Sequence, residues 1–271
     1  MKLLVATRNS KKLVELDRIL RAAGIDSVEL LSLSDVPEYP ERPETGRTFA
    51  DNAYIKAFDG ATHTGYACLA DDSGLSVDEL NGMPGVLSAR WSGTHGDDVA
   101  NYELLLAQMG DCPDERRTAS FRTACALVVP GVKEVPSALA DGGFPAVLDE
   151  AGNLLLVVEG RWPGSILREP VGDNGFGYDP VFAPAVGEGN EAEGALSAAQ
   201  MSAEDKDAFS HRGRALRALT PALKILAEVE PSGEPSGCRE PATSAGKRSR
   251  LPHGASSRQR RRGTGPRHRA R

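Results

Sequence analysis

The chain lacks the features that mark several common classes of protein. Its 271 residues include only four cysteines, at positions 68, 112, 125 and 238, and no two of them form a C-x-x-C pair. A disulfide framework or a zinc site is therefore not expected, and we interpret Cys68 and Cys125 as small buried apolar residues. No stretch reaches the roughly 18 consecutive apolar residues of a membrane span, and the apolar run near Met1 is too short for a secretory signal. We expect a cytoplasmic protein without a membrane-bound part.

Three motifs of nucleotide binding or covalent catalysis are missing as well. The sequence contains no G-x-x-x-x-G-K-[ST] loop, no G-x-G-x-x-G fingerprint and no G-x-S-x-G nucleophile elbow. These absences exclude a Walker A site, leave a dinucleotide-binding motif unsupported and argue against a serine-hydrolase mechanism. Any phosphate-binding site in this chain must be built in another way.

The charge is distributed unevenly. The formal net charge is −6, but residues 231–271 carry eleven basic and two acidic residues. This final segment is rich in Pro, Gly, Ser and Arg, and it has too few large apolar residues to offset the entropy of folding. We predict a folded domain at residues 1–230 and a disordered basic tail at residues 231–271.

Helical and strand-like patterns alternate along the folded part. Strands are expected near residues 2–6, 28–31, 66–70, 121–129 and 154–158. Helices are expected after residue 10, from Thr48 to about Gly65, near residues 98–109, and from about Ser202 onward. The Thr48 helix begins with a capping box, in which Asp51 is the fourth residue. Alternation of this kind predicts an α/β domain.

The junction between the first strand and the first helix is a candidate anion site. Lys11 and Lys12 fall in the first turn of the expected helix, where a cation opposes the helix dipole. A bound phosphate would make this placement favourable, because free backbone N–H groups, the Thr7 and Ser10 hydroxyls and a lysine would surround it. The alternative is a surface lysine pair beside an ordinary helix cap, with Asn9 or Ser10 as the cap.

The segment Asp71-Asp72-Ser73-Gly74 follows directly on an apolar run, which it is expected to end in a turn. A carboxylate there can hold magnesium, orient water or accept its proton. Successive strand residues point to opposite faces, so only one aspartate is expected to face a given cleft. The alternative is that Asp and Gly simply form the bend. Glu44, in a loop before the second helix, carries no signal of its own.

Two later segments are distinctive only in combination with the others. Residues 174–180 place Phe176 between two glycines, with Asp179 following, so that the backbone could approach a ligand and the ring could stack on a base. The alternative is a tight turn around a core aromatic residue. Lys206 could neutralise phosphate, and the tripeptide Ser210-His211-Arg212 could donate to base atoms. Their alternative is a solvated helix face.

Taken together, these segments resemble the inosine triphosphate pyrophosphatase family of non-canonical purine NTP pyrophosphatases. The matching pieces lie between about residues 2 and 229, in the order of the family: residues 7–12, Glu44 to Phe49 with Asn52, Ala53, Lys56 and Ala57, residues 71–75, residues 85–90, residues 176–179, and Lys206 with residues 210–212. The resemblance implies a mixed α/β fold with a long central sheet and a substrate cleft between two lobes, and it implies a homodimer. The implied reaction converts inosine, deoxyinosine and xanthosine triphosphates into the monophosphate and pyrophosphate.

The resemblance also assigns roles to individual residues. Glu44 and Asp72 would bind Mg²⁺, and Asp72 would accept the proton of the attacking water with Lys12 as the other catalytic residue. The implied substrate contacts are Thr7, Arg8, Asn9, Ser10, Lys11 and Lys12 for the triphosphate, Ser73, Phe176, Gly177, Tyr178 and Asp179 around the base, Lys206 for phosphate, and His211 with Arg212 for the purine edge.

The sequence departs from the family in two places, and two other functions compete. Residues 185–199 form a longer connection than is usual, and Gln200 stands where a glutamate is common. One competing function is a pyrophosphatase for modified pyrimidine triphosphates. The other is nucleic-acid binding through the arginine-rich tail, which would weaken steeply with salt.

Overall fold

The computed structural model describes residues 1–185, 187 and 196–228; the side chains of residues 10, 11, 203 and 207 are not part of the description. The predicted basic tail at residues 231–271 and most of the long connection at residues 185–199 lie outside this range. The disordered tail therefore stays a prediction. Among the described helices, none combines the length and the apolar character needed to cross a membrane.

The described chain is built on a seven-stranded mixed sheet with the order β2-β1-β3-β4-β6-β5, in which β7 also pairs with β6. The strands are β1 (Lys2–Val5), β2 (Glu29–Leu31), β3 (Ala67–Val77), β4 (Thr118–Val129), β5 (Ala146–Leu148), β6 (Leu154–Ile166) and β7 (Phe182–Pro184). Strand β1 runs parallel to β2 and β3, whereas the other pairs are antiparallel. The predicted α/β class with a mixed central sheet is confirmed.

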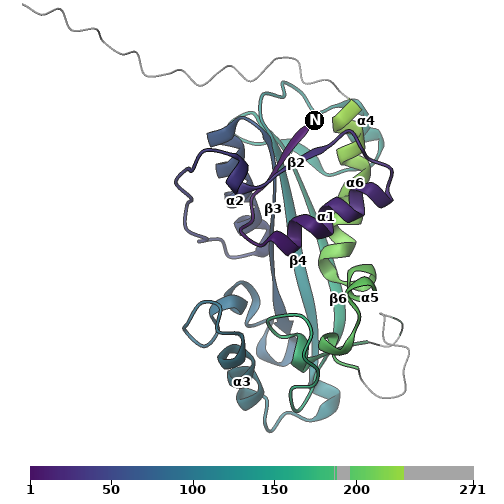
Figure 1. Cartoon of the computed structure of the whole chain (residues 1–271). Helices are drawn as coiled ribbons and strands as arrows, with labels where there is room; N and C mark the ends of the chain where they lie inside the picture. Colours follow the sequence, from purple (N-terminus) through teal and green to yellow (C-terminus); the bar gives the residue numbers. More distant parts are fainter. Residues whose placement is uncertain (186, 188–195, 229–271) are drawn as a thin grey trace, which may run out of the picture. The chain divides into compact units, whose positions relative to one another are not determined.

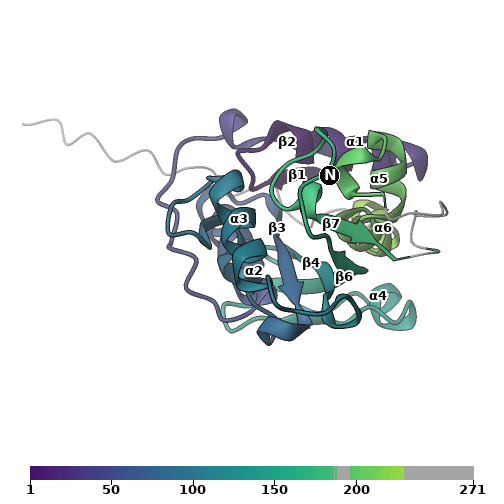
Figure 2. The ribbon, with the colours of Figure 1, turned by 90° about the horizontal axis from the view of Figure 1, so that it is seen from below.

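Helices cover both faces of this sheet. They are α1 (Ser10–Ala22), α2 (Phe49–Thr64), α3 (Asp98–Gln108), α4 (Ser137–Asp141), α5 (Ala203–Phe209) and α6 (His211–Glu228). Helix α2 lies on one face, and α1 and α6 lie on the other (Figures 1 and 2). The predicted capping box of α2 is present: Thr48 accepts from the Asp51 backbone N–H, and the Asp51 carboxylate accepts from that of Thr48. The helix ends at Gly65, as predicted.

Strand alternation divides the core between the two faces. Leu3 and Leu69 pack beneath α1 and α6, while Leu4 and Cys68 pack beneath α2. A third cluster, around Trp162 and Phe182, lies at the other end of the long strands and includes residues of α3. The fold thus has hydrophobic cores at both ends of β3, β4 and β6. Cys68 and Cys125 are fully buried free thiols, as predicted.

The predicted turn at residues 71–74 is wrong, because β3 continues through it to Val77. Strand β4 pairs with β3 over the whole stretch from Cys68 to Val77, which holds the Asp-Asp-Ser-Gly segment extended. Gly74 serves a close approach instead of a bend: a Cβ there would collide with the Ser88 hydroxyl and the Gly85 carbonyl. On its other side β3 pairs with β1 only as far as Leu69. The carboxylates therefore lie on a strand whose edge opens where β1 ends.

The last helical region is two helices instead of one. Helix α5 starts after the Ser202 cap, and Ser210 separates it from α6, which begins at His211. His211 and Arg212 are 7% and 8% exposed, so the alternative of a solvated helix face is wrong for them. The close approach of α6 to the sheet depends on Gly160 of β6, where a Cβ would collide with the His211 backbone. In the described part of the connection before α5, Gln200 completes a capping box with Ser197.

Candidate functional site

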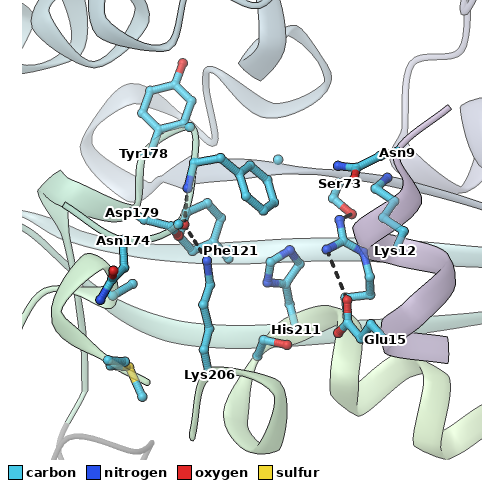
Figure 3. A pocket seen from close by; sticks show the side chains of 18 of the residues that line it. Asn9, Lys12, Glu15, Ser73, Phe121, Asn174, Tyr178, Asp179, Lys206 and His211 are labelled. Carbon is cyan, nitrogen blue, oxygen red and sulfur yellow. Dashed lines mark hydrogen bonds and ion pairs between the residues drawn. The ribbon is translucent and has the colours of Figure 1, made fainter. Parts of the chain in front are cut away.

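A cavity of about 660 Å³ lies between α1, β3, the loop that carries Phe176, and the start of α6 (Figure 3). Residues that the sequence singled out form much of its wall. Those are Asn9, Lys12, Ser73, Phe176, Gly177, Tyr178, Asp179, Lys206, His211 and Arg212. The wall also contains residues that the sequence did not indicate, among them Glu15, Asp98 and Phe121.

The first strand–helix junction contributes one end of the cavity. Asn9 and Lys12 line it, and Asn9 donates its backbone N–H to the Thr7 hydroxyl at 3.1 Å. Arg8 points away from this wall and pairs with Glu41 in solvent. Thr7 lies beside a smaller adjoining space that Lys12 shares. Of the six residues predicted to hold a triphosphate, the structure thus brings Asn9 and Lys12 to the cavity; the side chains of Ser10 and Lys11 are not described.

Lys12 contacts Asp71, not Asp72. Its ammonium donates to both oxygens of the Asp71 carboxylate, at 2.9 and 2.8 Å. Arg212 reaches the same carboxylate through Nε at 3.1 Å, and the Ser73 hydroxyl donates to it at 3.0 Å. Burial alone would raise the pKa of Asp71, but the Lys12 and Arg212 charges outweigh it and hold the pKa well below its ordinary value. Asp71 is therefore an ionised carboxylate that binds two cations, with three of its four hydrogen bonds on Oδ2.

Asp72 points to the opposite face of β3. It accepts from Asn52 Nδ2 at 3.1 Å and from Lys56 Nζ at 3.2 Å, and both donors belong to α2. Lys56 also pairs with Glu44 at 3.0 Å, so one ammonium lies between the two carboxylates that are predicted to bind Mg²⁺. Burial raises the pKa of Asp72, with the Lys56 charge opposing the shift. Asp72 is thus the less satisfied of the two aspartates.

The carboxylates of Glu44 and Asp72 supply oxygen ligands of the kind that Mg²⁺ prefers. Among the described residues no three His, Cys, Asp or Glu side chains gather as a metal site. Mg²⁺ is commonly held by one or two carboxylates, with phosphate oxygens and waters completing the shell. Glu44 and Asp72 already share a cation, Lys56, so the site favours positive charge.

Strand β1 pairs with β3 only as far as Leu69, so β1 does not cover the edge of β3 beside Asp71 and Asp72. Asp72 is not among the residues of the large cavity, so Lys12 and Asp72 do not line a common wall. Their neighbourhoods nevertheless interact, because the charge of Lys56 on the α2 face contributes to lowering the pKa of Asp71 on the other face.

The loop at residues 174–179 presents Phe176 to the cavity, and this residue is 49% exposed. Its backbone is held by two carboxylates: Phe176 N–H donates to Asp179 at 2.8 Å and Gly177 N–H donates to Asp98 at 2.7 Å. Lys206 pairs with Asp179 and lies 4.9 Å from the centre of the Phe176 ring. Phe176 is therefore available as a stacking surface, and Lys206 lies at this end of the cavity, where Figure 3 shows its contact with Asp179.

Tyr178 is the core aromatic residue of this loop. It is 4% exposed, and its hydroxyl donates to the Ser88 carbonyl at 2.9 Å. The loop therefore combines both interpretations of its sequence: one ring supports the core and the other faces the cavity.

His211 stacks on Phe121, with ring centroids 5.1 Å apart and planes inclined by 12°. Burial, together with the charges of Arg212 and Lys206, holds the pKa of His211 well below its ordinary value, so the ring is neutral. Its Nδ1 is buried without a hydrogen-bond partner. A bare acceptor is tolerated in such a position better than a bare N–H, so we assign the proton to Nε2.

Arg212 is held on three sides. Besides Asp71, its guanidinium meets the Ser73 hydroxyl at 3.4 Å and the Glu15 carboxylate at 3.6 Å. Glu15 comes from α1, one turn after Lys12, a position that reads in sequence only as part of an amphipathic helix. No local pattern could have linked it to Arg212.

Comparison with known proteins agrees with the family that the sequence predicted. The sequence profile of the Ham1 family matches residues 3–222. A dITP/XTP pyrophosphatase of Mycobacteroides abscessus is 57% identical over 229 residues, covering 84% of this chain and 98% of the relative. One of Nocardia farcinica is 56% identical over 227 residues, covering 84% and 97%.

Solved structures agree. The crystal structure of a nucleoside-triphosphatase, dITP/XTP pyrophosphatase, from Mycobacterium abscessus matches with a TM-score of 0.62 at 57% identity, over 82% of this chain and all of the other. A HAM1 protein from Coxiella burnetii matches with a TM-score of 0.66 at 34% identity, over 83% and 99%. The predicted family is confirmed, and the chain belongs to the Ham1 family.

Proposed function

We propose that this protein hydrolyses non-canonical purine nucleoside triphosphates, namely dITP, XTP and ITP, to the monophosphate and pyrophosphate. The observation that carries the proposal is one cavity that holds a lysine at a helix N-terminus with an arginine beside it, together with a neutral histidine and an exposed aromatic residue. A nucleotide needs both kinds of surface, since its phosphates are anionic and its base is flat and polar at the edge. The names of the relatives, dITP/XTP pyrophosphatases, support this choice of substrate.

The phosphate end supplies positive charge and a proton acceptor. We propose that Glu44 and Asp72 hold Mg²⁺, which would neutralise the phosphates and the charge that develops on the leaving pyrophosphate. Asp72 is suited to accept the proton of the attacking water, because only two donors, Asn52 and Lys56, contact its carboxylate. Lys12 and Lys56 bring further positive charge to the two sides of the strand edge.

The base end supplies donors to a purine oxygen. Neutral His211 with its proton on Nε2, and the guanidinium of Arg212, can both donate to O6 of hypoxanthine or xanthine. Adenine carries an amino group at that position and would leave those donors unpaired, a mismatch that discriminates by up to about 10⁴. Phe176 provides the stacking surface for the ring.

The test is pyrophosphate release from ITP, dITP, XTP, GTP, ATP and a panel of modified pyrimidine triphosphates, with Mg²⁺ and with EDTA. We expect release from the first three and near-background release from ATP, whose amino group leaves the O6 donors unpaired, with EDTA abolishing all of it. Release only from pyrimidine substrates would replace this proposal with the pyrimidine alternative. If activity survived complete metal removal, only the proposed role of Mg²⁺ would be refuted, and the proposed substrates would still stand.

We propose in addition that the protein is cytoplasmic and that it forms a homodimer, the latter as family membership implies. Analytical ultracentrifugation tests the dimer. Deletion of the basic segment at residues 231–271 tests whether this segment binds nucleic acid. The deletion should leave hydrolysis unchanged and remove any salt-sensitive retention on RNA or DNA.

A further inference from the structure

Asp71 joins three parts of the site through one buried carboxylate. Its two oxygens accept from Lys12 of α1, from Arg212 of α6 and from Ser73 of its own strand. Oδ2 accepts from Lys12, Ser73 and Arg212, while Oδ1 accepts from Lys12 alone, so the contacts concentrate on one oxygen. Asp71 is not among the residues lining the large cavity, so it acts from behind the wall.

The contact with Lys12 fixes the direction of the ammonium group. An ammonium has three N–H donors, and Asp71 takes two of them with nearly equal lengths, 2.9 and 2.8 Å. The third is left for the cavity that Lys12 lines. Asp71 thus determines where this third donor points, which the flexible lysine chain alone would not do.

The same carboxylate fixes the plane of Arg212. Nε donates to Asp71, while Ser73 and Glu15 hold the two terminal nitrogens at 3.4 and 3.6 Å. A planar guanidinium that is held on three sides has little freedom to rotate. Its remaining donors are therefore directed before any ligand arrives.

We propose that Asp71 is a positioning residue that holds two neighbouring cations of the nucleotide site, aligning Lys12 toward phosphate and Arg212 toward the base at the same time. The inference rests on the proposed function, because that function assigns the two cations to different groups of one substrate, its phosphates and its base. Asp72 would take part in the reaction at the edge of β3, and Asp71 would set the directions of the Lys12 and Arg212 side chains.

The test uses the full-length protein and two probes that each represent half of a nucleotide. Inorganic tripolyphosphate has no base, and inosine has no phosphate. Binding is measured without turnover, by calorimetry for tripolyphosphate and by ligand-observed NMR for inosine. Lys12→Met should weaken tripolyphosphate alone, and Arg212→Met should weaken inosine alone. Asp71→Asn should weaken both, each by about tenfold or more, because small displacements of positioned groups are costly.

Asp149→Asn is the matched control. Asp149 also accepts several hydrogen bonds, from Tyr54, Ala151 and Asn153, but it lies next to β5 and away from the cavity. It should lower the melting temperature without changing either affinity. A purely structural role for Asp71 would give this same pattern in Asp71→Asn and would overturn the proposal, as would a loss confined to one probe.

If Asp71→Asn does not fold, Asp71→Glu keeps the charge but displaces the oxygens by one methylene. It should weaken both probes by a smaller factor, and unchanged binding of either probe would refute the coupling. A wild-type protein that binds neither probe would count against the proposed function itself, a result distinct from both of these.

Discussion

Two neighbouring carboxylates on one strand have opposite environments. Asp71 faces α1 and α6, where it accepts from two cations and a hydroxyl, and the charges of Lys12 and Arg212 hold its pKa well below its ordinary value. Asp72 faces α2, where it has one amide and a shared lysine, and burial raises its pKa. The pleat of β3 produces this division, because adjacent side chains of a strand point to opposite faces.

The comparison shows how one strand can separate stability from reactivity. An ionised carboxylate that binds two cations and has a depressed pKa holds its neighbours in place but is a poor proton acceptor. An under-satisfied carboxylate is a liability for folding, yet it is able to accept a proton or a cation. The four predictions that follow test this division, from the largest expected effect to the smallest.

Replacing Asp72 should remove catalysis while leaving the fold intact. Asp72→Asn should lower kcat for ITP by about 10³-fold, the typical contribution of a general base. A raised pKa means that the ionised carboxylate is disfavoured in the folded state, so the neutral amide should leave the free energy of unfolding unchanged or higher. Pyrophosphate release and urea unfolding check both parts, and wild-type turnover in this variant would refute the assignment.

Replacing Asp71, in contrast, should lower the stability of the fold. Asp71→Asn leaves Lys12 and Arg212 buried without their shared counter-charge, which should lower the free energy of unfolding by about 3 kcal/mol. Because its folded pKa is depressed, the stability that Asp71 provides is present above its unfolded pKa and is lost only as the pH falls toward the folded value. The difference in the free energy of unfolding between wild type and variant should therefore persist across neutral and mildly acidic pH in urea titrations. A difference below about 1 kcal/mol would contradict the role of Asp71 as the shared counter-charge.

Removing the exposed ring should affect binding alone. Phe176→Ala should raise KM for ITP by about tenfold, since stacking of a base on an aromatic ring contributes about 1–3 kcal/mol. The ring is 49% exposed, so the melting temperature should hardly change. Val147→Ala, at an exposed apolar residue of β5 away from the cavity, serves as the control. Equal kinetics in the two variants would exclude stacking on Phe176.

The neutral state of His211 should appear in the pH dependence of stability. Because burial lowers its folded pKa, the unfolded chain binds a proton below about pH 6.5 that the folded chain does not. Stability should then fall with decreasing pH by up to about 1.4 kcal/mol per unit from this residue. His211→Phe, which keeps a ring against Phe121, should show a shallower loss between pH 6.5 and 5 in urea unfolding. Identical slopes would indicate that His211 is charged.

Local patterns predicted much of the fold. The capping box at Thr48, the helical periodicity of α1 and α3, and the apolar runs of β1 and β4 each correspond to an element of the structure. The opposed directions of Asp71 and Asp72 also follow from strand geometry. These features depend on neighbours within a few residues, which is what a sequence pattern contains.

The remainder depends on contacts between distant segments. Asp-Asp-Ser-Gly is typical of a turn, yet pairing with β4 keeps it extended, and Arg212, 141 residues away from Asp71, provides compensating charge. Glu15 and Phe121 likewise join the site only through the packing of α6 on the sheet. The sequence linked Lys12 with Asp72 as catalytic partners, whereas the structure pairs Lys12 with Asp71, and no local pattern could have distinguished the two aspartates.

The central claim is that Asp71 positions and Asp72 reacts. The most direct measurement is the turnover of saturating ITP with Mg²⁺ by Asp71→Asn and Asp72→Asn, each compared with wild type. At saturating ITP the account predicts that kcat of Asp71→Asn lies within about tenfold of the wild-type value, because loss of positioning mainly raises KM. The kcat of Asp72→Asn should remain about 10³-fold below wild type. The reverse order, with Asp72→Asn the more active of the two, would contradict it.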